Sequence, residues 1–105
     1  MREETVLKYR SFAEFYPFYL SEHENPVCRR LHFAGTSLGF ACLIVAVITF
    51  SLWFVLAGLV LGYAFAWVGH FFFEKNRPAT FKYPFYSFAG DWVMWKDIIV
   101  GKIAL

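Results

Sequence analysis

The sequence predicts an all-α, multi-pass membrane protein built on a central antiparallel pair of transmembrane helices. No Lys, Arg, Asp or Glu occurs from Phe33 to Phe73, and this stretch is about twice the roughly 20 residues that cross a bilayer. The chain is 59% hydrophobic and 23% aromatic, which is more than a soluble domain of this size can bury. We therefore expect one membrane-embedded domain over residues 1–105, with a helical hairpin at about 26–74 and amphipathic or partly inserted helices on either side.

The N-terminal segment, from about Val6 to Glu22, has the composition of an amphipathic helix at the membrane interface, because aromatic residues are mixed with Lys, Arg and Glu. Ser11 and Glu14 fit a capping box. Pro17 inside the segment predicts a kink, so we expect a broken helix. The first residues carry both charge signs and no short apolar core, which argues against a cleaved signal peptide.

The two spanning helices have start and stop signals. Asn25 and Pro26 suit the N-cap and the first position of a helix that runs to about Phe50. The second helix is expected from about Leu52 to Glu74. A loop over 77–84, which contains two prolines, should follow it. Segment 85–105 carries charges beside its tryptophans, so it is expected to form an interfacial or half-buried helix.

Basic residues set the expected orientation. Arg29 and Arg30 lie at the start of the hairpin, Lys75, Arg77 and Lys82 lie at its end, and the central turn has none. The positive-inside rule then places both ends of the hairpin on the cytoplasmic side. Because the sequence shows no retention signal or long tail, we expect a bacterial inner membrane rather than the endoplasmic reticulum of a eukaryote.

Three histidines are predicted to meet at one membrane surface. His32 and His70 lie at opposite ends of the uncharged stretch with Ser51 midway, so a hairpin that turns there brings both imidazoles to one level. His23 precedes the first helix and therefore lies on the same side. Glu74 follows His70 by four residues and shares its helix face. These three histidines and Glu74 are the candidate metal ligands, and such a set suits Fe(II) or Zn(II).

Several residues also have plainer interpretations. Each histidine can be an interfacial polar residue without a ligand. Cys28 and Cys42 are expected to be small apolar fillers, because no CxxC pair exists. Arg30 either anchors lipid phosphate or pairs with an acidic substrate headgroup, and Asp91 either makes a local salt bridge or reaches the site. The net charge of +2 comes with no basic patch, so nucleic acid is not an expected partner.

Three stretches form a set of motifs that covers most of the chain. They are 18–25 (FYLSEHEN), 30–36 (RLHFAGT) and 62–81 (GYAFAWVGHFFFEKNRPATF). The set resembles the family of the yeast 2-hydroxy fatty acid (2-hydroxypalmitate) dioxygenase, a group of small membrane proteins once labelled only as a domain of unknown function. The resemblance extends from about Phe12 to Met94, while the hairpin turn and the C-terminal helix match only in apolar character.

The resemblance implies an Fe(II)- and O2-dependent enzyme of fatty acid alpha-oxidation. It would convert a 2-hydroxy fatty acid to the one-carbon-shorter acid and CO2. The resemblance gives His23, His32 and His70 the iron-binding role. The role of Glu74 as a further ligand is inferred only from its spacing to His70, and Arg30 is expected to bind the substrate headgroup. The substrate supplies all four electrons that O2 takes up, so no flavin or nicotinamide site is required. The expected partners are the substrate, O2 and the bilayer, and a homo-oligomer is left open.

Two other classes of function compete with this hypothesis. One is a haem protein with His32 and His70 as paired axial ligands. The other is a non-enzymatic membrane protein such as a scaffold. A transporter of charged cargo is disfavoured, because such proteins normally keep an ionisable residue in mid-membrane and none lies between Phe33 and Gly69.

Overall fold

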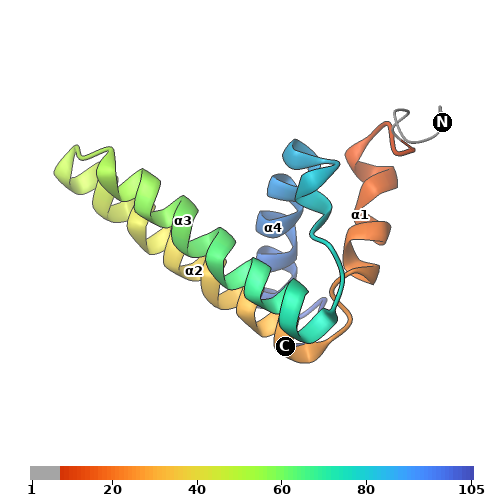
Figure 1. Ribbon diagram of the computed structural model, residues 1–105. Helices are drawn as coiled ribbons and strands as arrows, with labels where there is room; N and C mark the ends of the chain where they lie inside the picture. The colour runs from red at the N-terminus through yellow and green to blue at the C-terminus, as the bar shows by residue number, and fades with distance from the viewer. Residues whose placement is uncertain (1–7) are drawn as a thin grey trace.

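The computed structural model describes residues 8–105, and every regular element within this range is helical, as predicted. Helices α2 and α3 lie side by side as a long pair, α4 packs against α2 near one end of this pair, and α1 packs against α4 (Figure 1). The elements in chain order are α1 (Phe12–Ser21), α2 (Pro26–Thr49), α3 (Trp53–Val68), the π-helical turn η2 (Gly69–Glu74), the 3₁₀ turn η3 (Ala79–Phe81) and α4 (Pro84–Ile99).

Two helical segments are long and apolar enough to cross a membrane. They are α2, with 24 residues, and α3 continued by η2 over Trp53–Glu74, with 22 residues. At 1.5 Å per residue α2 is about 36 Å long, against about 30 Å for the hydrocarbon core of a bilayer. Near the turn the apolar side chains are largely exposed, with Ile48 at 71% and Phe50 at 94%. The predicted start is confirmed, because Asn25 Oδ1 accepts the backbone N–H groups of Val27 and Cys28 at 2.8 and 3.2 Å.

Glycines bring α2 and α3 into close contact. A Cβ atom added at Gly35 would lie 2.8 Å from the Cβ of Phe65 and 3.0 Å from the carbonyl oxygen of Gly62. Gly39 and Gly58 face each other in the same way nearer the turn. The two backbones can approach this closely only because side chains are missing between them.

The end of the pair is packed by an aromatic core between α1 and α4. Its fully buried members are Phe15, Tyr19 and Met94, with Ala79 and Tyr83 beside them. The Tyr16 hydroxyl on α1 donates to Asp97 Oδ2 on α4 at 2.8 Å. Trp95 Nε1 donates to Ser37 Oγ at 2.9 Å and so connects α4 to α2.

Helix α1 corrects one sequence prediction. It runs through Pro17 as a single helix from Phe12 to Ser21, so the expected break is absent. Pro17 removes only one backbone donor, and the burial of Phe15 and Tyr19 on either side of it holds the helix together. The Ser11 cap is confirmed, because its Oγ accepts the N–H of Glu14 at 3.2 Å. The expected start of this segment at Val6 lies outside the described residues.

Candidate metal centre

Three histidine rings meet where α1, α2 and η2 come together. The ring centroids of His23 and His32 are 4.2 Å apart, those of His23 and His70 are 4.6 Å apart, and those of His32 and His70 are 4.9 Å apart. The three residues are 1%, 4% and 2% exposed. Together with Cys28 they offer four ligand atoms that all lie within 4.8 Å of one another. The predicted convergence of the histidines is therefore observed.

Each of the three rings is held by an oxygen acceptor at Nδ1. His23 Nδ1 lies 2.6 Å from the carbonyl oxygen of Tyr19, and its ring stacks on the Tyr19 ring. His32 Nδ1 lies 3.2 Å from the carbonyl oxygen of Cys28. His70 Nδ1 lies 2.7 Å from Asn76 Oδ1. Because a carbonyl oxygen can only accept, all three Nδ1 atoms carry the hydrogen and all three Nε2 atoms present a lone pair, as in histidines that bind metals.

The Nε2 atoms of two of these histidines are spaced as two ligands of one divalent cation. Those of His23 and His32 are 3.0 Å apart, and two imidazole nitrogens that share one ion at about 2.1 Å each are separated by roughly this distance. Burial, followed by the neighbouring His32 and His70, lowers the pKa of His23 well below its usual value. The ring is therefore neutral near pH 7, which is the form that binds a metal.

Glu74 is not one of the four converging residues. Its Oε1 accepts the backbone N–H of Asn25 at 2.7 Å and so connects the end of η2 to the start of α2. Gly69–Glu74 forms a π-helical turn, and the spacing within it could not show that the Glu74 carboxylate is engaged by Asn25, which is 49 residues away in the sequence. The same turn brings Asn76 back to His70, with the Asn76 N–H on the His70 carbonyl at 3.0 Å.

Asp91 on α4 is the carboxylate that reaches the cluster. Its Oδ1 lies 3.8 Å from His32 Nε2 and accepts a hydrogen bond from the Tyr19 hydroxyl. Burial raises the pKa of Asp91 to about 7. The sequence left this residue open between a local and a functional role, because nothing in its spacing shows that α4 packs against the histidines.

Arg30 does not point to the cluster. Its Nε donates to the carbonyl oxygen of Leu105 at 3.1 Å. Its neighbour Arg29 donates from Nη1 to the carbonyl oxygen of His23 at 2.9 Å and from Nε to that of Ala104 at 2.8 Å. Arg29 therefore fixes the backbone that carries His23, a role that the sequence did not reveal. Cys28, predicted to be a filler, is fully buried with its Sγ 3.9 Å from His32 Nδ1.

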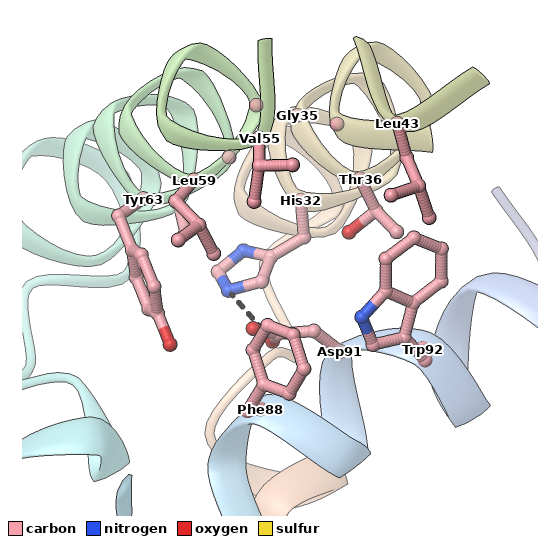
Figure 2. A pocket seen from close by; sticks show the side chains of 14 residues that line it. His32, Gly35, Thr36, Leu43, Val55, Leu59, Tyr63, Phe88, Asp91 and Trp92 are labelled. Atoms are coloured by element: carbon pink, nitrogen blue, oxygen red, sulfur yellow. Dashed lines mark ion pairs between the residues drawn. The ribbon is translucent and has the colours of Figure 1, made fainter. Parts of the chain in front are cut away.

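Two hollows adjoin the cluster. The larger is a groove between the α2–α3 pair and α4 that starts at His32 and Asp91 (Figure 2). The smaller is a polar void that shares these two residues and also touches His70 and Trp67. The Trp67 Nε1 atom is buried without an acceptor among the described residues. A buried donor of this kind is normally satisfied, so it marks a position where a bound polar group would be favourable.

The chain was compared with protein families, curated proteins and solved structures. A family model described as 2-hydroxy-palmitic acid dioxygenase Mpo1-like covers residues 9–103. No curated protein matches the chain, and no solved structure does.

Proposed function

The chain belongs to the 2-hydroxy-palmitic acid dioxygenase Mpo1-like family, and on this basis we propose that it is an Fe(II)-dependent dioxygenase of fatty acid alpha-oxidation. The reaction takes a 2-hydroxy fatty acid and O2 to the one-carbon-shorter fatty acid, CO2 and water. The observation that carries the proposal is the set of three Nδ1–H donors, each held by an oxygen, which leaves the Nε2 lone pair free on three rings whose centroids lie within 4.9 Å of one another.

In this proposal His23, His32 and His70 hold the iron, and Asp91 supplies the carboxylate. Histidines with a carboxylate and open positions are typical of non-haem iron oxygenases. The bound iron supplies the site where the hydroxy acid and O2 meet and exchange electrons. Asp91, rather than Glu74, is the better candidate because its Oδ1 lies near His32 Nε2, whereas Glu74 is engaged with Asn25.

Residues around the cluster have the chemistry to handle the substrate headgroup. Trp67 Nε1–H has no acceptor within residues 8–105 and can donate to a carboxylate or hydroxyl oxygen in the polar void. The Tyr19 hydroxyl donates to Asp91 and holds its carboxyl group in position.

We further propose that α2 and α3 with η2 cross the bilayer as a hairpin, with the cluster at the cytoplasmic surface. Length and apolar composition support the crossing, and the basic residues at the hairpin ends support the orientation. An amphiphilic substrate then reaches the cluster from the membrane without leaving it. A bacterial inner membrane is the proposed location.

The experiment that tests the function is metal analysis of anaerobically purified protein, followed by an assay of O2-dependent CO2 release from 2-hydroxy fatty acids. We expect near-stoichiometric iron in the wild type and its loss in His70→Ala. Phe72→Ala is the matched control, because Phe72 lies in the same turn and is 68% exposed. Stoichiometric zinc or a strong haem absorption band would contradict the proposal, as would a wild type that takes up no iron on reconstitution.

A further inference from the structure

The groove beside the histidine cluster has polar lining residues near the cluster and apolar ones toward the turn between α2 and α3. Figure 2 shows His32 and Asp91 facing each other among its lining residues. His32, Thr36 and Asp91 lie at the end near the cluster. Leu43 on α2 and Val55 on α3 are the lining residues nearest to the turn between these helices. The groove therefore leads from the candidate metal centre into the apolar part of the hairpin.

The shape of the groove is set by glycines on one wall and by aromatic side chains on the other. Four glycines of α2 and α3 line it, so backbone rather than side chains forms much of one wall. Phe88 and Trp92 of α4 form the opposite wall. The bond from Trp95 to Ser37 fixes the distance between α4 and α2. The result is a groove with a backbone wall on one side and aromatic side chains on the other.

The length of the groove matches one leaflet of a membrane. His32 and Leu43 are eleven residues apart on one helix, which corresponds to about 16 Å at 1.5 Å per residue. Half of a hydrocarbon core about 30 Å thick is about 15 Å. An acyl chain that keeps its orientation in the bilayer would therefore reach from the cluster to Leu43.

We propose that this groove binds the alkyl chain of a free fatty acid with its carboxyl end at the histidine cluster, and that Leu43 and Val55 limit the length of the chain. The proposal rests on the proposed function for the identity of the headgroup. It goes further by assigning the chain-binding surface and the residues that determine specificity.

A free fatty acid fits better than a bilayer phospholipid. The side chains at the polar end are 4% exposed for His32 and 16% for Asp91, so this end is closed and accepts a small headgroup rather than a phosphodiester with two chains. The sides are more open, with Leu59 and Phe88 exposed to 43% and 42%. A single chain can therefore enter sideways from the lipid, while its headgroup turns into the cluster.

The test is photo-crosslinking of purified protein in phospholipid nanodiscs with 2-hydroxy fatty acids of graded chain length, each carrying a diazirine at its methyl end. Peptide mapping should place crosslinks near Gly39 and Leu59 for short chains and at Leu43 and Val55 for longer ones. Crosslinks spread over outward-facing residues such as Val47 and Ile48, irrespective of chain length, would overturn the proposal and indicate ordinary lipid contact.

Leu43→Trp gives the second measurement, because a larger side chain should close the far end. We expect binding of long chains to weaken about tenfold, as when two methylenes can no longer be buried, with short chains unaffected. Ile44→Trp is the control, since Ile44 is the next residue and equally exposed, at 44% against 43%, but does not line the groove. Equal effects of the two variants would contradict the proposal.

These measurements separate the groove from the proposed chemistry. If the crosslink position shifts with chain length in a protein that binds no iron, the chain-binding groove is supported and the dioxygenase function is contradicted. If the protein shows iron-dependent turnover but its crosslinks are scattered over the lipid-facing surface, the dioxygenase function is supported and the groove is contradicted.

Discussion

The Nε2 atoms of His23 and His32 lie 3.0 Å apart, although neither has a hydrogen to donate to the other. Both Nδ1 atoms already face carbonyl oxygens, those of Tyr19 and Cys28. Two lone pairs therefore point at each other in a buried site, an arrangement that is unfavourable without a cation between them. The apo protein should hold this geometry at a cost in stability.

Metal binding should therefore stabilise the fold. An ion that binds only the folded state adds about 2.7 kcal/mol at a concentration one hundred times its Kd. We expect Fe(II), or Co(II) as a spectroscopic substitute, to raise the Tm of chelator-treated protein in detergent. His32→Ala should abolish the rise. A Tm that does not respond to any divalent ion would contradict a metal centre.

The bond between Asn76 and His70 should tune the affinity of the site. Asn76 Oδ1 accepts from His70 Nδ1 at 2.7 Å and so orients the ring. Asn76→Leu removes this acceptor and should weaken metal binding by about 10- to 100-fold. Asn76→Asp retains the acceptor and should restore most of the affinity. Both variants lose the bond from Asn76 Nδ2 to the Glu22 carbonyl, so the comparison in a chelator-competition titration isolates the contact with His70.

Trp67→Phe should separate headgroup recognition from folding. The indole Nε1 is buried and has no acceptor in the described part of the chain. Its loss should therefore change the Tm little but weaken binding of 2-hydroxy acids about tenfold, as expected for one hydrogen bond to a charged group. Trp95→Phe is the counterpart, because its Nε1 bonds to Ser37 and its loss should lower stability by about 1 kcal/mol. Binding assays and thermal unfolding on both variants check the pair, and a Trp67→Phe protein with unchanged ligand affinity would refute the role of Trp67.

The sequence predicted those features that depend on order and spacing along one chain. The uncharged stretch and the midpoint at Ser51 sufficed to predict the paired helices and the meeting of His32 with His70, and Asn25 with Pro26 marked the start of α2. Which carboxylate lies at the histidine cluster depends on tertiary packing, and spacing along the chain does not show it. Glu74 was predicted from its spacing to His70 alone, whereas its carboxylate bonds to the backbone N–H of Asn25, a contact between distant segments.

Asp91 was left open because its place depends on how α4 packs. That packing is set by contacts between distant segments, such as Tyr16 with Asp97 and Trp95 with Ser37. Neither pair has a signature in the sequence. Residues that act through tertiary packing, among them Arg29 at the His23 carbonyl, are the ones that spacing cannot reveal.

The bond between Tyr16 and Asp97 should make stability depend on alkaline pH. Burial, and then the hydrogen bond to Asp97, raises the pKa of Tyr16 above its ordinary value of 10.0. Above pH 10 the unfolded chain loses this proton while the folded chain keeps it, so the contribution is complete below pH 10 and is lost as pH rises further. Tyr16→Phe should lower stability by about 1 kcal/mol at neutral pH and flatten the decline above pH 10. Thermal unfolding measured from neutral pH to above pH 10 checks this prediction. The control is Tyr86→Phe, in the same aromatic cluster, which should still lose stability above pH 10 as the wild type does.

Close packing of α2 against α3 should be needed for metal binding at the histidine cluster, because Gly35 lies one turn beyond His32 on α2. A Cβ atom at Gly35 would lie 2.8 Å from Phe65 Cβ and 3.0 Å from the Gly62 oxygen, so Gly35→Ala must push the helices apart. Overpacking of this kind costs about 1–3 kcal/mol, of which the better helix propensity of alanine recovers up to about 1 kcal/mol.

Gly62→Ala on the facing helix is the matched control for Gly35→Ala. Its nearest neighbour, the carbonyl oxygen of Gly35, would lie at an ordinary 3.7 Å, so this variant should be as stable as the wild type or slightly more so. Because His32 and His70 lie on opposite members of the pair, we expect Gly35→Ala to lower both the Tm and the metal affinity, and Gly62→Ala to lower neither. If Gly35→Ala lost stability but bound metal as tightly as the wild type, the separation of the helices would not control the histidine cluster.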